Sequence, residues 1–197
     1  SFFKNEFRIV FPASAYDKGF RIFAESTAIN GKKMIELYPF RFPVKGKIDV
    51  GIRVGPECGD KGVMLVAVNG NDEKCAGVKF KDGFVWGSTF FGGKYTYDID
   101  KEPPSIVLQI RDGAILHSLK RLLAKIEDIG SGIGPQAEIN LYVDDKWFPA
   151  EYDPESAILK YEFEHQLEKG EHTITVEATD NVGNKRVERR KVVLVGE

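Results

Sequence analysis

Hydrophobic and polar residues alternate with a period of two in short runs along most of this 197-residue chain. The runs are rich in Val, Ile, Phe and Tyr, and clusters of Gly, Pro, Asn and Asp separate them, a pattern typical of antiparallel β-sandwiches. The clearest runs are Phe7–Phe11, Ile48–Val54, Val63–Val68, Lys94–Ile99, Glu138–Val143, His172–Val176 and Val187–Val195. The alternation predicts an all-β protein.

Three turn signals lie between predicted strands. Asn69-Gly70 and Asp82-Gly83 are two-residue pairs of the kind that close β-hairpins. Near the C-terminus, Asp180-Asn181-Val182-Gly183-Asn184 separates two alternating runs. Glycine takes positive φ without steric cost, and Asp and Asn side chains bond their own backbone, so this run also predicts a hairpin.

A proline pair divides the chain. Pro103 and Pro104 lack the N–H that a β-ladder requires and disfavour helix before them, so residues 100–104 predict a stiff, extended linker. We expect a β-sandwich domain over residues 1–102. A smaller, immunoglobulin-like β-sandwich is expected over residues 103–197.

The segment 115–126 gives a conflicting signal. Its apolar residues fall at 115, 116, 119, 122, 123 and 126, a spacing that fits an amphipathic helix better than a strand. An immunoglobulin-like module nevertheless requires a strand leading into Asp128. We therefore favour a strand from Arg121 to Glu127.

The charge balance argues against a nucleic-acid partner. Residues 1–102 contain 16 Lys and Arg against 13 Asp and Glu, whereas residues 103–197 contain 12 against 17, for a formal net charge of −2. Nucleic-acid binding normally needs a clustered basic face. The basic run 185–191 divides its charges between the two faces of a predicted strand, and a solvated edge strand is the favoured interpretation.

Other bulk features say little about the compartment. No apolar stretch approaches the roughly 18 residues of a membrane span. The chain opens on Ser1-Phe2-Phe3 as if in mid-structure, so we expect it to be a fragment of a longer protein. Cys58 and Cys75 lie in predicted loops, and two cysteines alone leave open whether they form a disulfide.

Four polar residues in two turn regions are candidate calcium ligands. Asp128, Asp180, Asn181 and Asn184 could supply some of the roughly six to eight oxygen atoms that Ca²⁺ takes. Turn formation accounts for the same residues without a metal, and it is the favoured interpretation. Ser131 stands between two glycines but lacks the Gly-x-Ser-x-Gly of a nucleophile elbow. We assign no catalytic residue and no cofactor.

Three aromatic residues are candidate ligand contacts. Trp86 belongs to the aromatic stretch 84–91, and Trp147 and Tyr152 lie in the second half of the chain. Exposed aromatic rings can stack on sugar rings. Aromatic residues are also common in strands, so core packing is the favoured interpretation of Trp86. For Trp147 and Tyr152, core packing and a surface platform both stay open, and the solvent exposure of the indoles discriminates between the two.

The order of the motifs resembles that of a known family. In the first half it includes Phe11-Pro12-Ala13-x-Ala15-Tyr16 and Phe91-Gly92-x-x-Tyr95. In the second half it runs through Pro103-Pro104-x-Ile106, Asp128-x-x-Ser131-Gly132-Ile133, Lys146-Trp147-x-x-x-Glu151-Tyr152-Asp153, Gly170-x-His172-x-Ile174 and Asp180-Asn181-x-Gly183-Asn184. This series resembles the C-terminal immunoglobulin-like module, and the region before it, of secreted bacterial zinc endopeptidases of the lysostaphin type.

The zinc-site motifs of that family do not occur in the sequence. They resemble His-x-x-x-Asp followed later by His-x-His, three ligands that leave a coordination position open for water. His117, His165 and His172 are the three histidines, and none stands in either pattern. The resemblance therefore implies a region that does not hydrolyse peptidoglycan by that chemistry.

The function that the resemblance implies is an accessory one. We expect an extracytoplasmic protein (periplasmic, envelope-bound or secreted) in which this region positions or anchors an upstream catalytic domain, or contacts the cell-wall polymer. An independent adhesion or carbohydrate-binding module of the cell envelope is the alternative. A hydrolase that uses carboxylates such as Asp144 and Asp145 is remote, because it needs two acids about 5–10 Å apart across a cleft. The sequence leaves the oligomeric state open.

Overall fold

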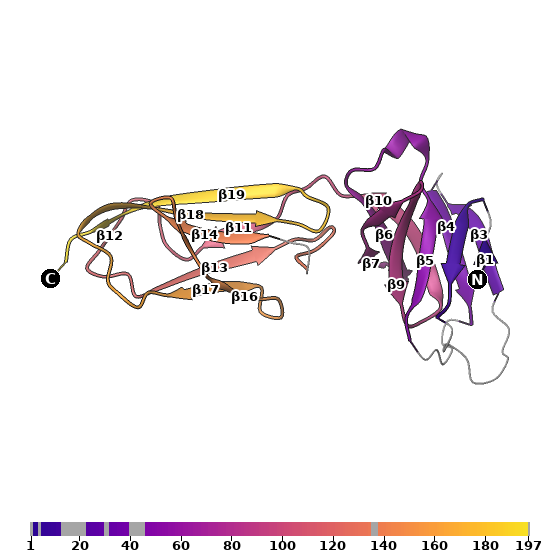
Figure 1. The fold of residues 1–197 in the computed structure, drawn as a ribbon, viewed down its shortest axis with the longest axis horizontal. Coiled ribbons are helices and arrows are strands. Elements are labelled where there is room, and N and C mark those ends of the chain that lie inside the picture. Colours follow the sequence, from indigo (N-terminus) through magenta and orange to yellow (C-terminus); the bar gives the residue numbers. More distant parts are fainter. Residues whose placement is uncertain are drawn as a thin grey trace. The chain divides into compact units, whose positions relative to one another are not determined.

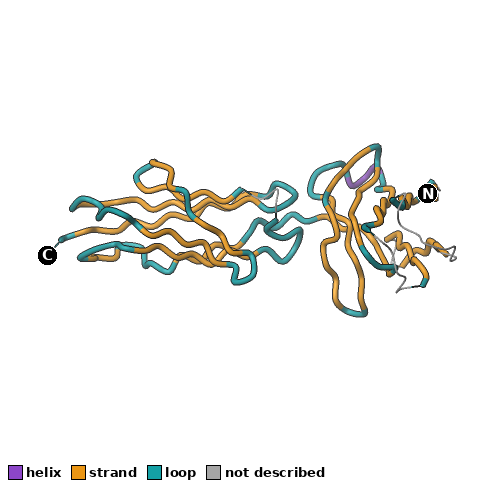
Figure 2. The backbone as a smooth tube through the Cα atoms, turned by 60° about the horizontal axis from the view of Figure 1, so that its bottom comes forward, coloured by secondary structure: helices purple, strands orange, loops and turns teal. Residues whose placement is uncertain are grey.

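The computed structural model describes residues 2–3, 5–12, 23–29, 32–39, 46–134 and 138–196. The chain divides into two units, Ser1–Lys101 and Glu102–Glu197, and each is built from β-strands (Figures 1 and 2). Among the described residues, the single helical element is a 3₁₀ turn, Pro56–Cys58. The predicted all-β class is confirmed. Within the same ranges, no helix has the length and apolar character to cross a membrane.

Two antiparallel five-stranded sheets form the first unit. In spatial order, the first sheet contains β1 (Phe2–Phe3), β2 (Phe7–Val10), β5 (Ile48–Arg53), β9 (Phe84–Thr89) and β8 (Lys79–Lys81). The second contains β3 (Phe23–Ile29), β4 (Lys32–Tyr38), β10 (Gly93–Ile99), β6 (Val63–Asn69) and β7 (Asp72–Gly77). One core joins both sheets, because alternate residues of their strands are buried against each other.

Strand β5 illustrates how the sequence builds this core. Ile48, Val50 and Ile52 are completely buried, while Asp49 and Arg53 between and beside them are exposed. A period of two places these two sets on opposite faces of the sheet. The face with Asp49 and Arg53 is therefore the outer face of the first sheet.

The second unit also packs two sheets around one core, and Figure 1 shows them as two layers. One sheet contains β11 (Ser105–Leu108), β13 (Arg121–Glu127), β17 (Ile158–Glu162) and β16 (Glu151–Asp153). The other contains β12 (Ala114–Leu116), β19 (Lys185–Leu194), β18 (Gly170–Thr179), β14 (Ile139–Val143) and β15 (Lys146–Phe148). All pairings in this unit are antiparallel except that of β12 with β19.

The ambiguous segment 115–126 is not a helix. It contains the end of β12, a turn that buries Leu119, and β13, whose residues Leu122, Ala124 and Ile126 alternate into the core. The helical spacing of the apolar residues arises because the segment joins the end of one strand to the next strand through a short connection. The strand favoured over Arg121–Glu127 is confirmed with the same bounds.

The three predicted hairpins are present. Asn69 pairs with Asp72, Lys81 with Phe84, and Thr179 with Lys185, so each turn signal lies between paired strands. The edge-strand interpretation of the basic run 185–191 agrees with the strand pairing. Strand β19 pairs with β18 along its whole length, whereas β12 pairs with it only at Val192–Leu194, so among the described strands residues 185–191 pair on one side alone.

Hydrogen bonds locate the boundary between the two units. The Asp100 N–H donates to the carbonyl oxygen of Gly62 in the first unit at 2.8 Å. On the other side of Lys101, the carbonyl oxygens of Glu102 and Pro104 accept hydrogen bonds from the side chains of Asn184 and Arg186 in the second unit.

Candidate functional site

An indole ring lies flat on the outer face of the first sheet. Trp86 of β9 pairs with Gly51 of β5 on one side and with Lys79 of β8 on the other. A Cβ atom on Gly51 would lie 2.8 Å from two ring carbons of Trp86, so the indole occupies the space above this glycine. Trp86 is partly exposed and belongs to the outer face, not to the buried core of the unit.

A second aromatic ring lies beside it under a cover of two arginines. Phe84 has a ring centroid 6.0 Å from that of Trp86 and is completely buried. The guanidinium carbons of Arg8 and Arg53 lie 4.3 and 4.7 Å from its centroid, within the range of cation–π contacts. The two arginines therefore shield Phe84 from water, and they leave Trp86 as the accessible ring of the pair.

A cavity of about 340 Å³ adjoins Trp86 on the same face. Its other lining residues are Val10, Asp49, Lys79, Lys81, Gly87 and Ser88. The Ser88 hydroxyl donates a hydrogen bond to Asp49 Oδ1 at 2.6 Å, which fixes the carboxylate and leaves its second oxygen as an acceptor. An aromatic face, an oriented acid and two ammonium groups thus meet around one hollow.

Two glycines hold the backbone of this strand in place. A Cβ atom on Gly87 would lie 2.3 Å from the carbonyl oxygen of Ala76, and one on Gly77 would lie 2.4 Å from that of Trp86. Strands β7 and β9 therefore approach each other more closely than side chains would permit. This contact positions the backbone that carries Trp86.

The other two aromatic candidates lie in the second unit and differ from each other. Trp147 is on the edge strand β15, is 54% exposed, and donates from Nε1 to Asn140 Oδ1 at 3.1 Å. Tyr152 packs against the core, and its hydroxyl donates to the Ile126 carbonyl oxygen at 3.0 Å. Burial raises the pKa of Tyr152. Trp147 is thus an exposed ring, whereas Tyr152 is largely a structural one.

The four candidate calcium ligands come from two loops that bond to each other. Asn181 donates from its side chain to the Ser131 carbonyl oxygen at 2.9 Å, and from its backbone to that of Gly132 at 3.1 Å. Asp128 accepts the Gly132 N–H at 2.7 Å within its own loop. The Asp128 and Asp180 motifs, distant in sequence, are therefore one connected structure.

Asp180 is the centre of its turn and is only 1% exposed. Its Oδ1 accepts the N–H groups of Val182 and Asn184 at 3.0 and 2.8 Å, and its Oδ2 accepts Asn184 Nδ2 at 2.8 Å. Carboxylate oxygens of Asp128 and Asp180 lie within 4.8 Å of each other. These hydrogen bonds of Asp180 lie within its own turn, as the turn interpretation predicts, and calcium binding by the four residues stays a prediction.

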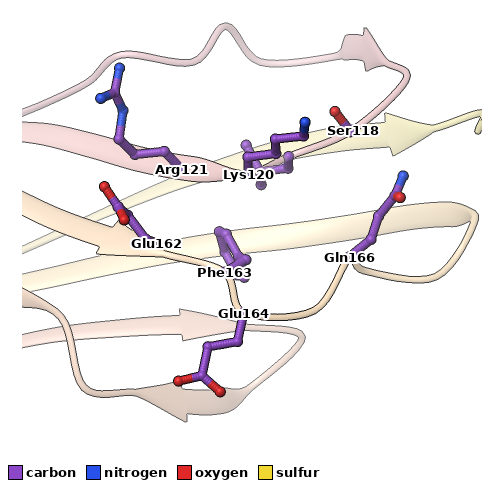
Figure 3. Close-up of a pocket in the computed structure, with 8 residues that line it drawn as sticks. Ser118, Lys120, Arg121, Glu162, Phe163, Glu164 and Gln166 are labelled. Carbon is purple, nitrogen blue, oxygen red and sulfur yellow. The ribbon is translucent and has the colours of Figure 1, made fainter.

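A groove of about 620 Å³ opens in the second unit where β13 begins and β17 ends (Figure 3). It is lined by Ser118, Leu119, Lys120, Arg121, Glu162, Phe163, Glu164 and Gln166. Figure 3 shows Glu164 pointing away from Ser118, Lys120 and Arg121. Glu162 is held by Lys160 at 2.7 Å, an ion pair that lowers the pKa of Glu162.

The groove has no catalytic constellation in the part of the chain that the structure describes. Ser118 is exposed, and the ring of the neighbouring His117 bonds through Nδ1 to the Gly196 carbonyl oxygen at 3.0 Å. A serine nucleophile needs a base within hydrogen-bonding reach. The lining instead mixes charges of both signs around Phe163.

One histidine is tightly engaged. His172 Nδ1 lies 2.6 Å from Asp144 Oδ2, and Nε2 lies 2.8 Å from the Glu168 carbonyl oxygen. Sequence analysis found the three histidines outside the zinc-site motifs and did not foresee this contact. Asp144 lies in a hairpin turn 28 residues before His172. The two residues meet because β14 pairs with β18, a pairing that the sequence pattern does not show.

Sequence reasoning also missed the polar groups around Trp86. Arg8, Asp49, Lys79 and Lys81 come from three other strands and share a face with Trp86 only through the register of the sheet. The alternation within each strand shows which residues share a face. It does not show which strands are neighbours.

Comparisons with known proteins give no family for this chain. No protein-family model matches it, and no curated protein sequence matches it. Similar solved structures include dimeric latent PorU from Porphyromonas gingivalis, with 16% identity and a TM-score of 0.37 over 76% of this chain. The match covers 22% of the PorU chain, so this chain spans about a fifth of that protein.

A second similar structure is one chain of the crystal structure of the mouse coronavirus receptor-binding domain complexed with its murine receptor. The identity is 9% and the TM-score 0.29, over 90% of this chain and 100% of that one. At these values neither likeness carries an argument about function.

Proposed function

We propose that the chain is the non-catalytic accessory region of a secreted or periplasmic cell-wall peptidase, where it positions or anchors the catalytic domain at the envelope. The observation that carries this proposal is the ordered motif series and its physical role. The Asp128 and Asp180 motifs, two members of the series that resembles lysostaphin-type peptidases, form one hydrogen-bonded pair of loops. In this proposal the two loops serve to define the module.

The Pro103-Pro104 segment supports the same proposal. Asn184 and Arg186 hold the carbonyl oxygens of Glu102 and Pro104. The Pro103-Pro104, Asp128 and Asp180 motifs, which are far apart in the sequence, are therefore connected by one set of hydrogen bonds. Contacts shared in this way are in keeping with the compact accessory module that the resemblance implies.

Hydrolysis of peptidoglycan is the direct test. We expect no release of soluble fragments when purified sacculi are incubated with the chain and Zn²⁺, and restored hydrolysis when the same region is joined to its native upstream sequence. Turnover by the chain alone would refute the accessory role. A native upstream sequence without a zinc-site domain would refute it as well.

The exposed indoles favour a second candidate function, an adhesion or carbohydrate-binding module of the cell envelope. Trp147 is 54% exposed, and Trp86 lies on an outer sheet face beside a cavity. Sedimentation with insoluble peptidoglycan and with glycans tests this function. Trp86→Ala and Trp147→Ala variants then show which unit binds, and retention by neither class of polymer would exclude it.

A further inference from the structure

The outer face of the sheet β1-β2-β5-β9-β8 has the features of a ligand site rather than of a solvated surface. Solvated sheet faces are normally polar, yet Phe84 and Trp86 stand here side by side in one strand. The glycine opposite Trp86 is what allows the indole to lie flat, since a Cβ at position 51 would meet the ring at 2.8 Å. The ring therefore presents its face, and not its edge, to an incoming group.

The indole is held before any ligand arrives. Close approach of Gly77 and Gly87 fixes the backbone of β9 from the opposite sheet, and Phe84 packs against the indole from one side. Arg8 and Arg53 in turn hold Phe84. Binding to a preformed surface avoids the entropy cost of ordering side chains.

The charges on this face are predominantly positive. Arg8, Arg53, Lys79 and Lys81 all lie on it, and none of them forms a salt bridge with another described residue. Asp49 is the acid among them, with Asp82 at the nearby hairpin turn. An anionic ligand matches this balance, and Lys79 and Lys81 line the cavity in which it would lie.

Asp49 decides between two kinds of anion. Its carboxylate, oriented by Ser88 at 2.6 Å, is an acceptor for hydroxyl groups and would repel a phosphate at the same place. Single-stranded nucleic acid also stacks successive bases on several rings, whereas of the two adjacent rings here Phe84 is completely buried and Trp86 is the accessible one. A ring with many hydroxyls and one carboxylate satisfies all of these groups.

We propose that this face binds an acidic polysaccharide through one uronate sugar, whose ring stacks on Trp86 while Asp49 and Ser88 bond its hydroxyls and Lys79 and Lys81 bind its carboxylate. The proposal deepens the second candidate function and rests on it. It does not depend on the peptidase role. The cavity of about 340 Å³ suits a single sugar unit of an extended polysaccharide rather than the broad surface of a protein partner.

Tryptophan fluorescence provides a direct test, because the protein has two tryptophans. In a Trp147→Phe variant, Trp86 is the one indole that emits. Titration with hexagalacturonate and with hexamannuronate should change its emission in a saturable way for at least one of them. Neutral cellohexaose and maltohexaose should bind at least about threefold more weakly, because they lose the contacts with two exposed cations.

Charge variants separate the proposed contacts from general attraction. Lys79→Gln/Lys81→Gln should weaken uronate binding about threefold to tenfold. A matched double variant at exposed lysines of the other unit, Lys125→Gln/Lys160→Gln, should leave it unchanged. Asp49→Asn should weaken binding of uronate and neutral sugars alike, whereas an adventitious electrostatic contact would tighten when this acid is neutralised.

Several results would overturn the proposal. One is the absence of any saturable change with either uronate up to about 10 mM. Another is equal affinity of the two lysine double variants for the uronates. A third is tight binding of an oligonucleotide by this face without any binding of uronates. The protein could also be retained on glycans or peptidoglycan through Trp147 and not through Trp86. That result would support the second candidate function and exclude this site. Circular dichroism of each variant confirms that the fold is intact.

Discussion

His172 Nδ1 lies 2.6 Å from Asp144 Oδ2, and this contact connects the β14–β15 turn to the start of β18. The other ring nitrogen faces the Glu168 carbonyl oxygen at 2.8 Å. A carboxylate and a carbonyl oxygen can only accept hydrogen bonds, so both ring nitrogens must donate. The geometry therefore selects the charged imidazolium, and Asp144 also accepts the Thr173 N–H at 2.8 Å.

The direction of both pKa shifts agrees with this geometry. Burial, the largest single influence, would lower the pKa of His172, but the hydrogen bonds to Asp144 and to the Glu168 carbonyl, with the charges of both acids, hold it above 6.5. Burial would likewise raise the pKa of Asp144, but the bonds from His172 and Thr173 outweigh it and hold that pKa below 3.8.

The first prediction is a loss of stability of the second unit at alkaline pH. A raised histidine pKa stabilises the fold fully below pH 6.5, and the contribution disappears as the pH rises through the folded pKa. The Asp144 contribution is present above pH 3.8 and is lost as the pH falls through its lowered pKa. Denaturation of a Trp86→Phe variant, followed by Trp147 emission, should show lower stability at about pH 8.5 than at about pH 5.5.

Two histidine variants decide whether this pH dependence comes from His172. His172→Gln should remove most of the difference between the two pH values, and His165→Gln, at an exposed position, should retain it. NMR titration of the imidazole should give a folded pKa above 6.5 for His172. A value below 6.5 would contradict the contact.

The second prediction concerns the buried acid of the β18–β19 turn. Asp180→Ala should destabilise the second unit by about 2–4 kcal/mol, because the N–H groups of Val182 and Asn184 would lose their acceptor in a buried place. Glu171→Ala, at an exposed position of the preceding strand, is the matched control and should change stability by less than about 0.5 kcal/mol. Chemical denaturation measures both, and equal effects would show that the turn does not depend on Asp180.

Local pattern was sufficient for most strands and insufficient for the sites. The three hairpin turns follow from alternation and turn chemistry, which act over a few residues. Strand β13 is the exception, because the local spacing of residues 115–126 fits a helix better and the strand was inferred from the need of an immunoglobulin-like module for a strand before Asp128. Element type is therefore encoded locally in most of this chain, but not in that segment.

The contacts between distant strands could not be predicted in the same way. Both Phe84 and Val85 are apolar and completely buried, so composition does not show which of them faces the core. The choice depends on Gly51, 35 residues before Trp86, which makes room for the indole on the outer face. The loops of Asp128 and Asp180 were each recognised as turns, but their mutual hydrogen bonds depend on the packing of the two sheets.

The third prediction tests the cover over Phe84. Arg8→Ala should cost about 0.5–2 kcal/mol in the first unit, because it removes a guanidinium at 4.3 Å from the ring and exposes apolar surface. Lys74→Ala removes an exposed charge from the other sheet of the same unit, away from Phe84, and should be nearly neutral. Urea denaturation of both variants in a Trp147→Phe background, followed by Trp86 emission, gives the comparison. A neutral Arg8→Ala would show that Arg53 alone suffices.

The last prediction contrasts Gly51, which lies opposite Trp86 in the neighbouring strand β5, with Gly87, which follows Trp86 in β9. Alanine at position 51 meets a side chain, the indole, which can swing away, whereas alanine at position 87 meets the carbonyl oxygen of Ala76 at 2.3 Å. Gly51→Ala should therefore leave stability within about 1 kcal/mol, since the restricted unfolded chain offsets part of the crowding. It should shift Trp86 emission to the red and increase its quenching by acrylamide. Gly87→Ala should destabilise the first unit by about 1–3 kcal/mol or more, because two strands must separate. Unchanged emission and quenching in Gly51→Ala would show that the indole does not lie on this glycine, and would remove the preformed ring on which sugar binding depends.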